Sequence, residues 1–189
     1  MTGQEHYFRY LKSRSRIGFL YRRFWLYPKL CRPLKGRTLD IGCGIGDFIS
    51  YKANSIGVDI NPEAVEWCTR RGLDARLMPL NILPFEDSLF DSVILDNVLE
   101  HLENPKQLLE EISRIIVAGG VLLIGVPGRR GYLSDPDHKV FYDENLLTST
   151  LLASGFKLGN LFYAPFHFAW LESRMRQYCL YGVFQYEGV

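Results

Sequence analysis

Short apolar runs alternate with amphipathic stretches along the chain from residue 38 onward. The runs predict strands at Thr38–Cys43, Ser55–Ile60, Ala75–Pro79 and Asp91–Asp96. A fifth strand is predicted at Val121–Val126, which is apolar throughout, as strands covered on both faces are.

Three amphipathic stretches predict helices between these strands. Asn61-Pro62 and Asn104-Pro105 each supply an N-cap followed by a proline suited to the first helical turn. We expect the first helix to run to about Arg71 and the second to end at Gly119-Gly120. The third is predicted over Asp143–Ser154.

Two strands rich in Tyr and Phe follow, at Phe156–Phe166 and Gln177–Tyr186. Because no long helix separates them, we expect them to pair antiparallel at one edge of the sheet. Strands that alternate with helices predict an α/β domain built on a mainly parallel sheet.

The composition is that of one globular domain. The chain has 189 residues, of which 47% are hydrophobic and 23% charged. No apolar run approaches the roughly 20 residues of a membrane-spanning helix, and the amino terminus lacks the apolar stretch of a secretory signal. The four cysteines lie far apart without a CxxC pair, which argues against a disulfide scaffold or a zinc site. We therefore expect a cytoplasmic protein with no bound metal.

Charge is distributed unevenly along the chain. The first 37 residues carry ten Lys or Arg and one acidic residue, whereas the remaining 152 carry twelve basic and twenty acidic residues. The sequence therefore predicts a basic, aromatic and helical arm over residues 1–37 and an acidic domain over residues 38–189. Such a basic arm favours an anionic partner.

A glycine-rich segment, Leu39–Asp47, connects the first predicted strand to an expected helix. Its glycines permit a tight turn and the close approach of a ligand, and they are Gly42, Gly44 and Gly46. A dinucleotide-binding loop would need glycine in place of Asp47, and Asp40 and Asp47 would repel a pyrophosphate. A cationic cofactor without phosphates suits this loop better than NAD does.

Asp59 ends the second predicted strand, nineteen residues after Asp40. In this kind of sheet an acidic residue there lies beside the first loop and accepts hydrogen bonds from both hydroxyls of a ribose. S-adenosylmethionine combines an adenosine with a positive charge and has no phosphate. The glycine loop and Asp59 together therefore favour this cofactor.

Five segments resemble, in order, the class I S-adenosylmethionine-dependent methyltransferases of the small-molecule, type 11 branch. They are LDIGCGIGDF (39–48), GVDINPEAV (57–65), ILPFEDSLFDSVILDNVLEHLENP (82–105), LLEEISRIIVAGGVLLIGVP (108–127) and FYDENLLTSTLLASGF (141–156). The resemblance implies a single Rossmann-like domain with a seven-stranded sheet of order 3-2-1-4-5-7-6, strand 7 being antiparallel. It also implies S-adenosyl-L-methionine as cofactor and S-adenosyl-L-homocysteine as product.

The resemblance assigns cofactor contacts to particular residues. The methionine part would be held in the glycine loop by Asp40, Gly42, Cys43, Gly44 and Gly46. Asp59 would hold the ribose and Ile60 would pack on the adenine. Asn81, where the family usually has an aspartate, and Ile82 would lie at the adenine. Asp96 and Asn97 would face the methionine end.

Two histidines are candidates for chemistry. Methyl transfer depends on aligning the reactants and excluding water, and it needs a base only for a hydroxyl or a protonated amine. His138 lies in the loop after the fifth strand, where Asp135 or Asp137 could orient it as a base or acceptor contact. His101 follows the fourth strand, and the alternative for it is a role in lining the pocket.

Residues 13–30 place apolar side chains at helical spacing among Arg and Lys. Three alternatives stay open: a helix that covers the cofactor, an amphipathic helix on a membrane surface, or a clamp for an anionic substrate. Together with the aromatic stretch Leu161–Trp170, this segment favours an amphipathic acceptor, and nucleic acid is not expected.

The sequence thus predicts an enzyme that transfers a methyl group to a small-molecule, glycan-related or lipid-linked acceptor. A non-catalytic subunit that binds the cofactor and supports a partner protein is the main alternative, and an NAD-dependent oxidoreductase is a weaker one. The expected location is cytoplasmic, with peripheral membrane contact through residues 13–30 left open.

Overall fold

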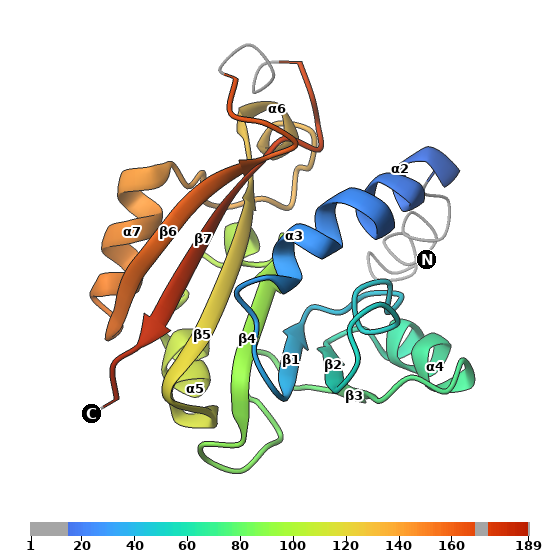
Figure 1. Ribbon diagram of the computed structural model, residues 1–189, viewed down its shortest axis with the longest axis vertical. Coiled ribbons are helices and arrows are strands. Elements are labelled where there is room, and N and C mark those ends of the chain that lie inside the picture. The colour runs from blue at the N-terminus through green and yellow to red at the C-terminus, as the bar shows by residue number, and fades with distance from the viewer. Residues whose placement is uncertain (1–14, 169–173, 189) are drawn as a thin grey trace.

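The computed structural model describes residues 15–168 and 174–188, so the first fourteen residues of the predicted arm and Trp170 lie outside the described residues. One seven-stranded sheet has the order β3-β2-β1-β4-β5-β7-β6 (Figure 1). The strands are β1 (Thr38–Ile41), β2 (Ser55–Asp59), β3 (Ala75–Leu77), β4 (Phe90–Asp96), β5 (Ile116–Pro127), β6 (Phe156–Ala164) and β7 (Cys179–Tyr186). β7 pairs antiparallel with both β5 and β6, and the other pairs are parallel. The predicted strand order and the antiparallel seventh strand are confirmed.

Helices cover both faces of this sheet. They are α2 (Arg16–Tyr21), the π-helical η1 (Arg22–Leu26), α3 (Tyr27–Cys31), α4 (Pro62–Arg70), the 3-10 turn η2 (Leu99–His101), α5 (Lys106–Ile115), α6 (Arg129–Tyr132) and α7 (Glu144–Leu152). Among the described residues, none of these helices has both the length and the apolar character needed to cross a membrane.

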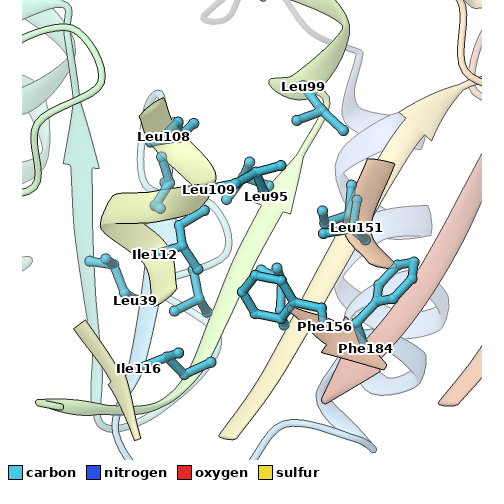
Figure 2. Packing of buried hydrophobic residues seen from close by; sticks show 14 of the residues in the cluster. Leu39, Leu95, Leu99, Leu108, Leu109, Ile112, Ile116, Leu151, Phe156 and Phe184 are labelled. Carbon is cyan, nitrogen blue, oxygen red and sulfur yellow. The ribbon is translucent and has the colours of Figure 1, made fainter. Parts of the chain in front are cut away.

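One face of the sheet is packed by α5 and α7. The apolar face of α5 places Leu108, Leu109 and Ile112 in the same buried cluster as Leu39 of β1 and Leu95 of β4 (Figure 2). Because alternate strand residues point to opposite faces, this packing accounts for only half of the apolar side chains on β4.

The helices α2, η1 and α3 follow one another and cross in front of the sheet near β4 and β5 (Figure 1). From these helices, Leu26, Tyr27 and Leu30 are buried in a second cluster with Ile94 of β4 and Leu123 of β5. The end of the basic arm is therefore packed on the second face of the sheet.

One predicted helix end agrees with the structure and another does not. Asn61 caps α4, because its Oδ1 accepts hydrogen bonds from the amides of Glu63 and Ala64. The predicted end of α5 at Gly119-Gly120 is wrong, since α5 ends at Ile115 and both glycines lie within β5. The reason is tertiary: Ile116 is extended and pairs with Phe90 of β4, which buries it.

The helix expected directly after the glycine loop is absent from the described residues. Turns follow the loop instead, with the amide of Ser50 donating to the carbonyl of Gly46 over 2.9 Å. Asn54, at φ 56°, then reverses the chain before β2 begins at Ser55.

Candidate active site

A cavity of about 460 Å³ opens at the carboxyl ends of β1, β4 and β5. In an open α/β sheet, this edge is where ligands bind. Its walls come from the arm helices, the glycine loop, the end of β4, the segment after β5 and residues 176–181. The volume is typical of a site for a cofactor and a small second ligand.

The predicted cofactor residues divide between the cavity and the surface beside it. Those that line the cavity are Asp40, Gly42, Cys43, Gly44, Asp96 and Asn97. Ile60 and Ile82 lie outside its wall and are about half exposed, and Asn81 has a positive φ of 58° in the turn after β3. The structure therefore brings the methionine-side residues together and leaves the adenine-side residues on the adjacent surface beyond β2.

Two glycines of the loop serve different purposes. Gly42 has φ 76°, and a Cβ there would come within 2.5 Å of Cγ2 of Val98, so only glycine fits. Gly46 does not line the cavity, and a Cβ at this position would meet Leu73 and Cys68. Gly46 therefore allows the loop to pack closely against α4.

Asp59 holds the glycine loop in place. Its Oδ2 accepts a hydrogen bond from the amide of Gly44, and its Oδ1 accepts one from the amide of Asn61, both at 2.8 Å. Burial raises the pKa of Asp59, while these backbone donors oppose the change. Each oxygen has a further lone pair, so the carboxylate can also accept from ribose hydroxyls.

Acidic side chains converge on the loop end of the cavity. Asp40 is buried, and its pKa is raised well above the usual value by burial first and then by Asp96 and Asp59. Buried carboxylates at close range are stabilised by a positive charge between them. The residues present therefore fit a cofactor whose reacting centre is a cation.

Sequence reasoning missed two residues of β7 beside these acids. The hydroxyl of Tyr181 donates to Oδ1 of Asp96 over 2.9 Å, and Sγ of Cys179 lies 3.8 Å from Oδ1 of Asn97. Both side chains line the cavity. Alternation along β7 could have shown that they share a face, but not which strand they reach.

The arm helices form the cover of the cavity. Tyr21, Arg22, Leu26 and Tyr27 line it, and Nη2 of Arg22 forms a largely buried ion pair of 3.2 Å with Oδ2 of Asp47. The arm thus contacts the glycine loop directly. This geometry agrees with the first of the three alternatives for the arm, a helix that covers the cofactor.

At the other end of the cavity, His101 and His138 lie side by side, with ring centroids 4.7 Å apart. Nε2 of His138 lies 3.7 Å from Oε1 of Glu100 and 4.0 Å from Oδ2 of Asp135. Of the two expected partners of His138, Asp135 is therefore nearby.

Glu100 is a buried residue whose role the sequence did not reveal. It is fully buried, and burial raises its pKa to about 8, with smaller effects from Asp96 and Asp135. The pKa of the adjacent His101 is lowered, by burial first and then by His138. The only sequence signal was an acidic residue between Leu99 and Leu102.

Comparisons with known proteins agree with this geometry. A family model described as "Methyltransferase domain" matches residues 39–124. An uncharacterized protein of Methanocaldococcus jannaschii is 36% identical over 121 residues, which are 61% of this chain and 59% of that protein. A probable S-adenosylmethionine-dependent methyltransferase of Mycobacterium tuberculosis is 30% identical over 156 residues, 74% of this chain and 57% of its own length.

A further relative is the tRNA (carboxymethyluridine(34)-5-O)-methyltransferase of Arabidopsis thaliana, 30% identical over 55% of this chain and 28% of that protein. Among solved structures, a Thermotoga maritima protein described as a possible histamine N-methyltransferase has a TM-score of 0.74 at 20% identity, covering 96% of this chain and 99% of that one. The chain spans less than two thirds of the length of the curated relatives named here.

Proposed function

We propose that this chain transfers a methyl group from S-adenosyl-L-methionine to an acceptor in the cavity, as the match of residues 39–124 to the methyltransferase domain family supports. The observation that supports the proposal is the continuity of the cavity from the glycine loop to His138. A methyl donor at the loop and an acceptor at the histidines would lie in one continuous space. Such alignment is the main requirement of an in-line methyl transfer.

Each part of the cavity has a task in this proposal. The bound cofactor supplies a methyl group on a sulfonium. Asp40 and Asp96 would balance that positive charge, and Asp59 would hold the ribose while it positions the loop. Tyr21 and Arg22 of the arm would cover the site and exclude water.

The acceptor end of the cavity is polar. Its wall includes Ser134, Asp135, His138, Arg176 and Gln177, and these side chains offer hydrogen-bond donors, acceptors and both signs of charge. We therefore propose a small-molecule acceptor, or the polar head of a glycan-related or lipid-linked one. The tRNA-modifying relative makes transfer RNA the competing class for the acceptor screen.

Calorimetric titration with S-adenosyl-L-homocysteine and with S-adenosyl-L-methionine tests the cofactor site. We expect binding in the micromolar range that is lost in Asp59→Ala, because the ribose contact and the support of Gly44 disappear together. Asp74→Ala is the matched control, since the side chain of Asp74 is half exposed and pairs with Arg76 on the surface. No binding by the parent protein would refute the proposal, and unchanged affinity in Asp59→Ala would refute the ribose assignment.

Release of S-adenosyl-L-homocysteine then reports the acceptor class in a screen of small hydroxy and amino compounds, lipid-linked glycans and transfer RNA. Turnover with a member of the first two classes supports the proposal. Turnover with transfer RNA alone would contradict the small-molecule assignment. Stoichiometric cofactor binding without turnover, in a stable complex with another protein, would establish the non-catalytic alternative.

A second candidate function concerns the exposed face of the arm. Ile17, Leu20 and Phe24 follow the spacing of one helical face and are 81%, 51% and 72% exposed, with the exposed Arg16 beside them. Large apolar side chains flanked by Arg suit the interface of an anionic membrane. We propose that this face rests on such a surface and that a lipid-linked acceptor enters there.

Flotation with vesicles containing phosphatidylglycerol tests this contact. The parent protein should rise with the vesicles at low salt, and the double variant Ile17→Ser/Phe24→Ser should stay in the bottom fraction. Leu133→Ser is the matched control, because Leu133 is 73% exposed and lies outside the arm. A parent protein that stays in the bottom fraction would refute the membrane contact.

A further inference from the structure

Three potential metal ligands meet at the cavity, where His101 and His138 line the wall and Glu100 is buried behind them. Glu100, His101 and His138 each offer one ligand atom, and these atoms lie within 4.8 Å of one another. Glu100 and His101 belong to η2, and His138 comes from the segment after β5. The amides of Lys139 and Val140 donate to the carbonyl of Glu100 over 2.7 and 3.1 Å, which holds the two segments together.

Glu100 is the first reason to expect an ion here. Its side chain is fully buried, and neither carboxylate oxygen has a hydrogen-bond partner among the described residues, apart from the amide of Glu100 itself. A buried carboxylate without partners is strongly destabilising. The site therefore requires a proton or a cation at Glu100.

The tautomer of His138 is the second reason. Its Nδ1 lies 2.8 Å from the carbonyl oxygen of Tyr132, and because a carbonyl only accepts, Nδ1 carries the proton. In the neutral ring, Nε2 then carries the lone pair, and it faces Oε1 of Glu100 at 3.7 Å, beyond hydrogen-bond distance. Two acceptor atoms that face each other across this gap leave room for a cation between them.

The hydrogen bond at the ring of His138 resembles that of metal-binding histidines. A ligating histidine usually donates its second ring nitrogen to a backbone carbonyl or a carboxylate, which orients the ring. His138 does so to Tyr132. Its ring thus has one nitrogen fixed and one nitrogen available.

We propose that Glu100, His101 and His138 bind one divalent transition-metal ion, with Zn²⁺ as the representative case. Two imidazoles and one carboxylate suit such an ion better than Mg²⁺ or Ca²⁺, which prefer oxygen ligands. Ligand bonds of about 2.0–2.2 Å are compatible with the 3.7 Å gap between Nε2 and Oε1. Bringing all three atoms onto one ion requires shifts of roughly 1 Å.

The role of the ion rests on the proposed function. Three protein ligands leave an open position, and the cavity lies on that side of His101 and His138. An acceptor hydroxyl bound there loses its proton to solvent more readily, because the ion stabilises the oxyanion. That oxygen forms the new O–CH₃ bond while the S–CH₃ bond breaks. The electron pair of the broken bond stays on sulfur. The acceptor class is therefore an alcohol or a phenol.

Titration of chelator-treated, metal-free protein with Co²⁺, followed by visible absorption, tests the site, and calorimetry with Zn²⁺ repeats it. We expect one ion per chain, with affinity at least tenfold lower in Glu100→Gln, His101→Asn and His138→Asn. His167→Asn is the matched control, since His167 stacks on Tyr163 and does not line the cavity.

Absence of saturable binding, or equal affinity in His138→Asn, would overturn the proposal and leave Glu100 protonated beside His138. Circular dichroism checks the fold of each variant. If Glu100→Gln does not fold, the two histidine variants decide the matter. Titration of the same metal-free protein with S-adenosyl-L-homocysteine separates the two proposals, because cofactor binding without metal binding overturns only the metal site.

Discussion

Tyr181 of β7 donates a hydrogen bond of 2.9 Å to Asp96 at the end of β4, although β5 lies between these two strands. The contact passes over Gly125 of β5. A Cβ at Gly125 would lie 2.4 Å from Cε1 of Tyr181 and 2.5 Å from Oδ1 of Asp96. The missing side chain therefore allows a residue of one strand to orient a carboxylate two strands away.

Tyr181→Phe should lower the free energy of unfolding by about 1–2 kcal/mol, because the partly buried Asp96 loses a donor. Affinity for S-adenosyl-L-homocysteine should fall severalfold, since Asp96 loses a hydrogen bond that orients its carboxylate, while the side-chain amide of Asn97 still donates to the same oxygen. Denaturant titration and calorimetry measure the two effects. Tyr186→Phe, on the same strand but away from the cavity, should change neither.

Gly42→Ala should cost more stability than Gly72→Ala, although both glycines have nearly the same φ, 76° and 74°. Gly72 has no atom within 4 Å of an added Cβ, so this variant measures the backbone cost alone, about 1 kcal/mol. Gly42→Ala adds a clash with Val98, for a total of about 2–4 kcal/mol. Equal losses of stability in the two variants, measured by thermal or chemical denaturation, would show that Val98 moves aside without a cost in free energy.

Arg22→Ala should increase the dissociation rate of S-adenosyl-L-homocysteine severalfold, because the arm loses its ion pair with Asp47. Stopped-flow measurement in a double-mutant cycle with Asp47→Ala should show that the two changes do not add. Arg16→Ala is the control, as Arg16 is exposed and does not line the cavity. Fully additive effects would mean that the ion pair does not hold the arm helices over the cavity.

In metal-free protein, stability should fall as the pH rises from about 5 to 8, in part because of Glu100. Its pKa is raised from 4.5 to about 8, so the native state retains a proton that the unfolded chain has lost. The contribution of Glu100 to the free energy of unfolding is complete below pH 4.5 and is lost by about pH 8. It amounts to at most about 5 kcal/mol. Asp96, Asp135 and His138 face this group and are unchanged in the test.

Glu100→Gln should therefore flatten the dependence of unfolding free energy on pH, measured by denaturant titration. A smaller decrease of stability with rising pH should remain, because the pKa values of Asp40 and Asp59 are also raised. Glu111→Gln is the contrasting variant. The pKa of Glu111 is lowered from 4.5, chiefly by its hydrogen bond with Arg114, so its loss should reduce stability without changing the slope between about pH 5 and 8. An unchanged slope in Glu100→Gln would mean that Glu100 is ionised in the native state.

Local features of the sequence predicted much of the fold. The Asn61 cap, the apolar face of α5 and the uniformly apolar core of β5 all depend on neighbouring residues, so a short window contains them. The strand order came from the resemblance, because periodicity alone does not say which strands become neighbours. The predicted boundary between α5 and β5 was wrong for the same reason, since the pairing of Ile116 with Phe90 determines where the helix ends.

The site shows the same division. Asp40, Gly42 and Gly44 stand in one recognisable segment and were predicted to lie together, as they do in the cavity wall. The proximity of Glu100 to His138 depends on how the segment after β5 folds back on η2. Tyr181 reaches Asp96 only because Gly125 leaves space between them. Such long-range juxtapositions have no signature in a single sequence.

The cavity wall combines Tyr21, near one end of the described chain, with Tyr181, near the other. During synthesis, the glycine loop therefore emerges long before the pocket can close. A nascent chain that lacks β7 has the loop but lacks the Tyr181 hydroxyl that donates to Asp96, so tight cofactor binding should first occur when residues 179–186 have been added. Cofactor binding then stabilises only the fully folded chain and would report completion of the sheet.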